Sequence, residues 1–201
     1  MRLLYSSMSP FARKVRVAAH ELGLTDRLEL TVVSPYTDES LRATNPLSKI
    51  PVLITEEGAA IFDSPVICQY LEHRAGVTAL TPSSGPARWI ALTRQAMADG
   101  LGDAARTIFR ERLRASETGE APRQDLLDRQ TASVIAVLDQ LEADVPPLDR
   151  FQIGEIAVAV QLAYLDLRAV TEWREGRPKL ADWHAKTTLR PSMVATAPQL
   201  A

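Results

Sequence analysis

Cysteine and histidine, which most often build metal and disulfide sites, are scarce in this chain. Cys68 is the only cysteine among 201 residues, so neither an intrachain disulfide nor a cysteine-rich zinc cluster can form. The three histidines, His20, His73 and His184, lie too far apart in the sequence to pair as ligands on one helix. We therefore predict neither a structural disulfide nor a bound metal.

Long apolar runs and a dominant charge are absent as well. No segment approaches the ~20 apolar residues that cross a bilayer, and the amino terminus has no apolar core of signal-peptide length. With 23 basic and 25 acidic side chains the net charge is −2, which gives no general attraction to nucleic acid or anionic lipid. We expect a cytoplasmic protein with no nucleic-acid partner and no membrane partner.

The first 77 residues alternate short apolar runs with segments of helical spacing, a pattern typical of an α/β unit. Strands are predicted at 3–5, 28–33, 51–54 and 60–62, and helices at 11–22, 38–43 and 64–71. Gly23 ends the first helix, and the turn Glu56-Glu57-Gly58 joins the last two strands as a hairpin. The predicted order of elements is βαβαββα.

From residue 87 onward, apolar residues recur only at helical spacing. Residues 78–86 form the predicted linker before this region, because they include the helix-breaking run Thr81-Pro82-Ser83-Ser84-Gly85-Pro86. Apolar stripes run from Ile90 to Ile108, from Leu127 to Leu141 and from Ile153 to Leu167, with a weaker one from Leu180 to Thr187. We predict an all-α helical bundle domain at 87–201 after an α/β domain at 1–77.

Four short motifs, in this order along the chain, carry a resemblance to a known family. They are Ser9-Pro10-Phe11 with Arg16, the segment 45–53, Phe62-Asp63-Ser64, and the segment 151–157. With these motifs on such a two-domain pattern, the chain resembles glutathione transferases, most of all bacterial members with a serine before the proline of the first helix. The resemblance implies a thioredoxin-like N-terminal domain, glutathione as co-substrate, a homodimer and a role in detoxification. One departure is Gln152, where the family usually has a serine or threonine cap.

Glutathione carries a carboxylate at each end and a thiol between them, so its site must hold both carboxylates and position the sulfur. The resemblance implies that Lys49, Ile50, Pro51 and Val52 belong to that site, with Pro51 in the cis form. It implies that the N–H and C=O of Val52 pair with the cysteinyl backbone like an added strand. Lys49 is then the partner expected for the glycyl carboxylate.

The helix that begins at Asp63-Ser64-Pro65 is the second expected part of the glutathione site. A side-chain oxygen followed by proline is a typical helix start, and its unpaired N–H groups suit an anion. The resemblance implies that Ser64 binds the γ-glutamyl carboxylate through its hydroxyl and N–H, with Asp63 beside it.

The resemblance implies that Ser9 is the catalytic residue, whose hydroxyl bonds the glutathione sulfur. Its hydroxyl lies where Pro10 opens a helix, and a donor there bonds a thiolate more strongly than a thiol, which lowers the thiol pKa. Ser7, Ser6 and Tyr5 are near enough to be alternatives, because other classes of the family use a tyrosine or an earlier serine. A serine at position 9 in place of cysteine also disfavours thiol-disulfide chemistry, which needs a protein thiolate.

The second substrate is expected to be a small, mostly apolar electrophile lying against the first long helix of the helical domain. Phe11, Met97, Leu101 and Phe109 are the residues that we expect to line its pocket. The predicted activity is conjugation of the glutathione thiolate to this electrophile, or a related glutathione-dependent cleavage or isomerisation. The alternative is a non-catalytic protein that keeps the fold to bind a partner, and the intact glutathione residues favour the enzyme.

Overall fold

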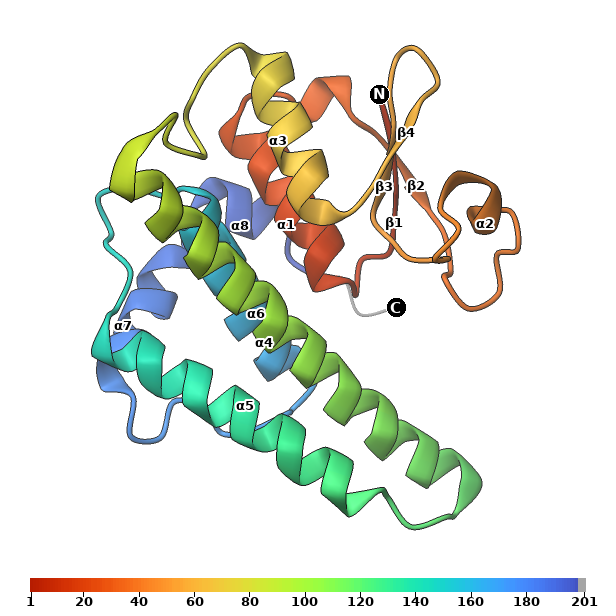
Figure 1. Ribbon diagram of the computed structural model, residues 1–201, viewed down its shortest axis with the longest axis vertical. Helices are drawn as coiled ribbons and strands as arrows, with labels where there is room; N and C mark the ends of the chain where they lie inside the picture. Colours follow the sequence, from red (N-terminus) through yellow and green to blue (C-terminus); the bar gives the residue numbers. More distant parts are fainter. Residues whose placement is uncertain (199–201) are drawn as a thin grey trace. The chain divides into compact units, whose positions relative to one another are not determined.

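The computed structural model describes residues 1–198, which form two compact units. One unit contains Met1–Trp89 together with the segment from Arg190 onward, and the other contains Ile90–Leu189. Among the described residues, strands occur only in the first unit, as Figure 1 shows.

The α/β unit has the predicted element order. It runs β1 (Arg2–Tyr5), α1 (Pro10–Glu21), a 3-10 turn (Thr25–Arg27), β2 (Glu29–Val32), α2 (Leu41–Thr44), β3 (Val52–Ile54), β4 (Ala60–Ile61) and α3 (Ser64–Ala75). The sheet order is β2-β1-β3-β4, with β2 parallel to β1 and β3 antiparallel to both of its neighbours. This is a thioredoxin-like arrangement, so the predicted fold of the unit is confirmed.

Successive residues of β1 and β3 point to opposite faces of the sheet, so each strand contributes to two cores. On one face, Leu4 and Val52 pack against Leu41 of α2. Leu3 and Leu53, both fully buried, point to the other face, where α1 and α3 lie side by side (Figure 1). The starts of α1 and α3 are therefore held by one shared core.

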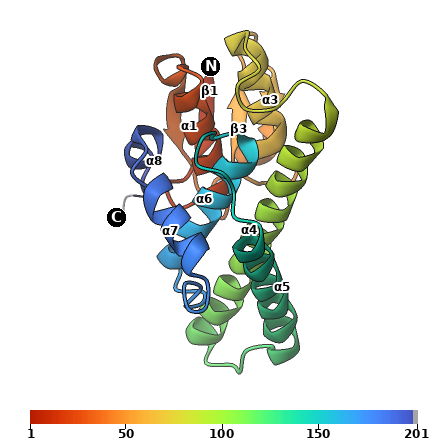
Figure 2. The ribbon, with the colours of Figure 1, turned by 90° about the vertical axis from the view of Figure 1, so that its left-hand side faces the viewer.

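The helical unit is organised around α6 (Ile153–Leu167), in which every residue from Ile153 to Leu162 is buried. The other helices of the unit are α4 (Gly85–Thr118), α5 (Gln124–Ala143) and α7 (Pro178–Thr187). Figure 2 shows α6 between α4 and α7. Such a helix is apolar on all sides because it is covered on all sides.

The last described helix, α8 (Pro191–Ala195), packs within the α/β unit, although the sequence predicted one helical domain through residue 201. Buried Arg13 of α1 donates from Nη2 to the C=O of Met193 at 3.0 Å. Glu21, at the end of α1, accepts from Arg190 and from the Ser192 hydroxyl. These side-chain contacts between distant segments leave no periodic signal in the sequence. Residues 199–201 of the predicted domain lie outside the described residues.

Candidate glutathione site

The start of α1 has the geometry expected of a capped helix. Ser9 Oγ accepts the N–H of Ala12 at 3.2 Å, and Pro10 occupies the first helical position. A hydroxyl that accepts through a lone pair still has its proton to donate. Ser9 can therefore cap the helix and donate to a thiolate at the positive end of the helix dipole at the same time.

The three alternatives to Ser9 lie in the segment just before it. Ser6 Oγ accepts the N–H of Met8 at 3.4 Å, Ser7 is half-buried, and Tyr5 is the last residue of β1. None of the three lies at the N-cap of α1, so Ser9 remains the residue that we predict to contact the sulfur.

Two arginines of α1 give this segment a positive surrounding. Burial, with a smaller contribution from the charge of Arg16, lowers the pKa of Arg13 to about 10. Burial also lowers the pKa of Arg16, whose guanidinium lies 5.3 Å from the centroid of the Tyr5 ring. Both side chains stay protonated at neutral pH, so their charge adds to the helix dipole in favouring an anion.

The loop before β3 has the expected cis Ile50–Pro51 bond, and Asn45, for whose side chain the sequence predicted no role, organises this loop. The side chain of Asn45 donates to the C=O of Lys49 at 2.9 Å and accepts the N–H of Leu47 at 3.0 Å. Asn45 is only 1% exposed. Asn45 is the first residue of the segment 45–53 that carries the family resemblance, and its side chain ties the two ends of the loop together.

The direction of the Val52 backbone differs from the expectation. The N–H of Thr55 donates to the C=O of Ala59 at 2.8 Å, so Thr55, and Leu53 two residues earlier, face β4. Val52 therefore faces β1, where it lies opposite Leu4 inside the sheet. The expectation that its N–H and C=O pair with a ligand backbone is wrong, because β1 already occupies that side.

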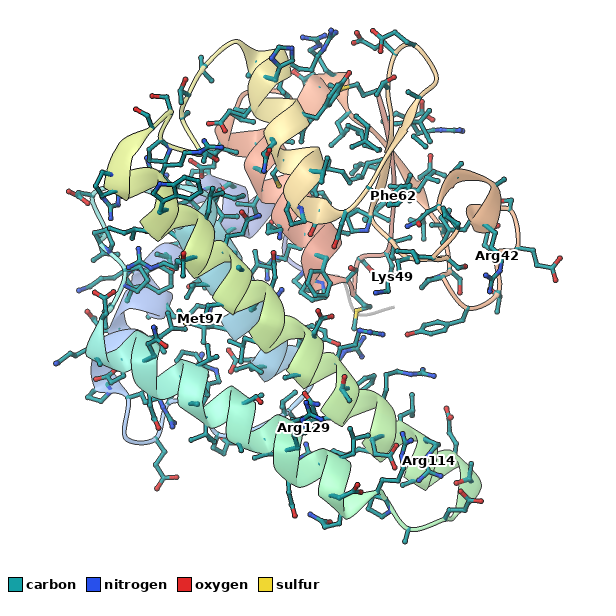
Figure 3. The ribbon with its side chains drawn as sticks, viewed as in Figure 1. Arg42, Lys49, Phe62, Met97, Arg114 and Arg129 are labelled. Carbon is teal, nitrogen blue, oxygen red and sulfur yellow. The ribbon has the colours of Figure 1, made fainter. Side chains whose placement is uncertain are left out.

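Ile50, two residues before Val52, has backbone groups that are available to a ligand. No hydrogen bond between described residues involves its N–H or C=O. Its side chain packs on the cluster of Leu4, Leu41 and Val52, as does Phe62 just before α3. This shared cluster brings the segments 49–52 and 62–64 together, and Figure 3 shows Lys49 and Phe62 in neighbouring parts of the unit.

The start of α3 presents a buried hydroxyl. Asp63 is the N-cap and accepts the N–H of Ser64. Ser64 is fully buried, and its Oγ has no hydrogen-bond partner in the described part of the chain. A buried hydroxyl without a partner is uncommon and calls for an explanation, such as a ligand that supplies the missing bond.

The residues expected to line the electrophile pocket are only partly brought together. Met97 and Leu101 of α4 line a groove of about 520 Å³, whose other wall is Gln130, Ser133 and Val137 of α5. Phe109 lies on another face of α4, where Arg168, at the end of α6, stacks on its ring at 4.2 Å from the centroid. Phe109 does not line this groove, so one pocket for Met97, Leu101 and Phe109 stays a prediction. Phe11 is half-buried on α1.

Known proteins match this chain in both of its units. The family model for the glutathione S-transferase N-terminal domain matches residues 8–74, and the model for the C-terminal domain matches residues 124–186. The chain belongs to the glutathione S-transferase family. An uncharacterized GST-like protein of Escherichia coli, YibF, is 34% identical over 98% of both chains.

Solved structures of glutathione transferases extend this likeness to the whole fold. A family member from Pseudomonas fluorescens Pf-5 with bound glutathione is 38% identical, with a TM-score of 0.91 over 99% of both chains. A further structure from that organism, with bound S-(propanoic acid)-glutathione, is 36% identical, with a TM-score of 0.85 over the full length of both chains. Among the described residues of this chain, no helix is long and apolar enough to cross a membrane.

Proposed function

We propose that this family member is a glutathione transferase that joins the glutathione thiolate to a small electrophile. The observation that carries the proposal is the unpartnered, buried hydroxyl of Ser64 at the start of α3, next to the segment that contains cis Pro51. The family membership and the related P. fluorescens structure with bound glutathione support it. We also propose that the protein is cytoplasmic and that it forms a homodimer. Light scattering would test the dimer through its molar mass.

In the proposed complex, the tripeptide lies along the segment 49–52 and the start of α3. Its γ-glutamyl carboxylate accepts a hydrogen bond from the Ser64 hydroxyl. Its cysteinyl backbone pairs with the N–H and C=O of Ile50, and not with those of Val52 as the sequence predicted. Lys49 is exposed and has no ion-pair partner among residues 1–198, so its ammonium group is available for the glycyl carboxylate. The sulfur then lies at the start of α1, beside Ser9.

One hydrogen bond from Ser9 accounts for only part of the proposed activity. A thiol of pKa about 8.5 is roughly 3% ionised at pH 7, and lowering its pKa by about two units makes it roughly 75% ionised. Lower basicity weakens the nucleophile by about eightfold, so the net gain in rate is about threefold. Most of the rate enhancement therefore has to come from holding the electrophile beside the sulfur.

Two measurements test the proposal. Calorimetry should detect binding of glutathione, and turnover of chlorodinitrobenzene should exceed the uncatalysed rate. Replacing Ser9 by alanine should raise the pKa of bound glutathione in a thiolate absorbance titration. An unaltered titration would transfer the role to Ser7 or Tyr5, and binding without turnover would favour the non-catalytic alternative.

A further inference from the structure

Among the described residues, two that are not glycine have a left-handed backbone, and their surroundings differ. They are Ser48, with a φ of 52°, in the loop before β3, and Ala169, with a φ of 46°, shortly after α6. A side chain makes this conformation unfavourable, so glycine is the residue most often found in it. Each of the two positions therefore calls for an explanation.

The end of α6 explains the backbone of Ala169. A left-handed residue after the last turn commonly closes a helix, because the N–H groups that follow can then bond to carbonyls of that turn. Here the N–H of Ala169 donates to the C=O of Asp166, and the N–H of Val170 donates to the C=O of Leu165, both at 3.1 Å. The backbone of Ala169 thus has a structural role, and its methyl group carries no polar function.

The backbone of Ser48 is fixed from both sides by Asn45. The N–H of Ser48 donates to the C=O of Asn45 at 2.8 Å, and the C=O of Lys49 accepts from the Asn45 side chain at 2.9 Å. Neither bond involves the side chain of residue 48, and glycine would make the same turn with less strain. The turn therefore gives no reason for a serine at this position.

The hydroxyl of Ser48 has no partner within the described part of the chain. The side chain is half-buried, and no hydrogen bond between residues 1 and 198 involves its Oγ. A serine hydroxyl has one proton to donate and two lone pairs that accept. Ser48 therefore presents a free donor directly before Lys49.

The charges around Ser48 favour an anion as the acceptor of this hydroxyl. The segment 41–55 contains two basic side chains, Arg42 and Lys49, and no acidic one. Both cations are exposed, neither has an ion-pair partner among the described residues, and Figure 3 shows both in the part of the unit that holds α2. A hydroxyl next to an ammonium group suits a carboxylate, because a hydrogen bond to a charged acceptor is stronger than one to a neutral acceptor.

We propose that the Ser48 hydroxyl, together with Lys49, binds the glycyl carboxylate of glutathione. The serine then gains from a ligand what its strained backbone loses in the free protein. This inference rests on the proposed function and adds a residue that determines its substrate choice. The site prefers a tripeptide whose glycyl end is a free carboxylate over one whose glycyl end is uncharged.

The test compares glutathione with its glycinamide, in which an uncharged amide replaces the glycyl carboxylate. In calorimetry, Ser48→Gly should lower the affinity for glutathione by about tenfold, because a hydrogen bond to a charged group is lost. Its affinity for the glycinamide should stay within about twofold of the native value. The midpoint of thermal unfolding should stay within about 2 °C, because relief of the left-handed backbone offsets the greater freedom of glycine in the unfolded chain.

Three further variants separate the hydroxyl from the backbone. Ser48→Ala removes only the hydroxyl and should show the same selective loss as Ser48→Gly. Lys49→Met should also lower the affinity for glutathione more than the affinity for the glycinamide. The matched control is Ala169→Gly, which relieves the other left-handed residue and should leave both affinities unchanged.

The outcomes of this test are distinguishable from failure of the proposed function. If the native protein binds glutathione and turns over chlorodinitrobenzene, but both Ser48 variants bind glutathione with native affinity, only the role of Ser48 is overturned. An equal loss of affinity for glutathione and the glycinamide has the same meaning, because the hydroxyl would then act on the loop and not on the carboxylate. If the native protein binds neither ligand, the transferase function and this inference fail together.

Discussion

Two buried carboxylates of the helical unit and the buried hydroxyl at the start of α3 in the α/β unit differ in whether they have a partner. In the helical unit, the two most deeply buried carboxylates, each 1% exposed in its side chain, are bonded to arginines: Glu155 to Arg94 at 2.8 Å, and Glu111 to both Arg114 and Arg123. In the α/β unit, the fully buried hydroxyl of Ser64 has no partner among the described residues.

The comparison separates groups that hold the fold from groups that are open to a ligand. A buried charge with its partner is costly to break, because removal of one side leaves the other unpaired. A buried donor without a partner lowers stability, and this cost is recovered only when a ligand supplies the missing bond. We therefore expect substitutions at Glu155 and Glu111 to act on unfolding, and those at the proposed glutathione site to act on affinity.

The largest effect is expected from Glu155→Ala. This change leaves the Arg94 guanidinium buried without its close partner and removes the acceptor of the Gln152 N–H, so it should lower the free energy of unfolding by about 3 kcal/mol or more. Urea denaturation measures this loss of unfolding free energy. The matched control is Asp144→Ala, because the Asp144 side chain also pairs with Arg94 but is 83% exposed, and it should cost less than about 1 kcal/mol. Equal losses in the two variants would contradict the comparison.

Asn45→Ala should weaken glutathione binding by about tenfold and lower the free energy of unfolding by about 1–2 kcal/mol, because Asn45 is buried and makes two hydrogen bonds. The change releases the C=O of Lys49 and the N–H of Leu47, so the loop that presents Ile50 is no longer preorganised. Calorimetry gives the affinity. Asn45→Asp keeps the acceptor for the Leu47 N–H but loses the donor to the Lys49 C=O. Its affinity for glutathione should lie between those of the native protein and Asn45→Ala. Native affinity in Asn45→Ala would show that the loop needs no such support.

Ser64→Ala should weaken glutathione binding several-fold while leaving the unfolding free energy unchanged or raised by up to ~1 kcal/mol, because it removes a hydroxyl without a partner. The contrast is Ser192→Ala. Ser192 is also fully buried, but its hydroxyl donates to Glu21, so its loss should cost about 1 kcal/mol. A destabilised Ser64→Ala variant with native affinity would reverse both assignments.

Glu111 should make the helical unit sensitive to acid. Hydrogen bonds, first from Arg114 and then from Arg123, hold the pKa of Glu111 well below its usual value of 4.5. Its contribution to stability is therefore complete above about pH 4.5 and is lost as the pH falls below that value toward the folded-state pKa. Between about pH 5 and pH 3, Glu111→Gln should lose less stability than the native protein, as measured by thermal unfolding at each pH. If the curves of stability against pH are parallel for the two proteins, the protonation of Glu111 does not change on unfolding.

Much of the candidate site could be predicted because its parts are local. Helix starts at Ser9-Pro10 and Asp63-Ser64-Pro65 depend on neighbours in the chain, and both occur at those residues. The side-chain amide of Asn45 could not be assigned in this way, because its partners become visible only when the loop closes on itself.

The sequence alone determined the βαβαββα order, the helical character of the second half, and the family, since these follow from local periodicity and short motifs. Only the tertiary structure decided which side of β3 carries the Val52 backbone, which face of α4 carries Phe109, and that α8 docks on α1. The reason is that pairing depends on which distant segments approach, and spacing along one chain does not record the side chains of its neighbours.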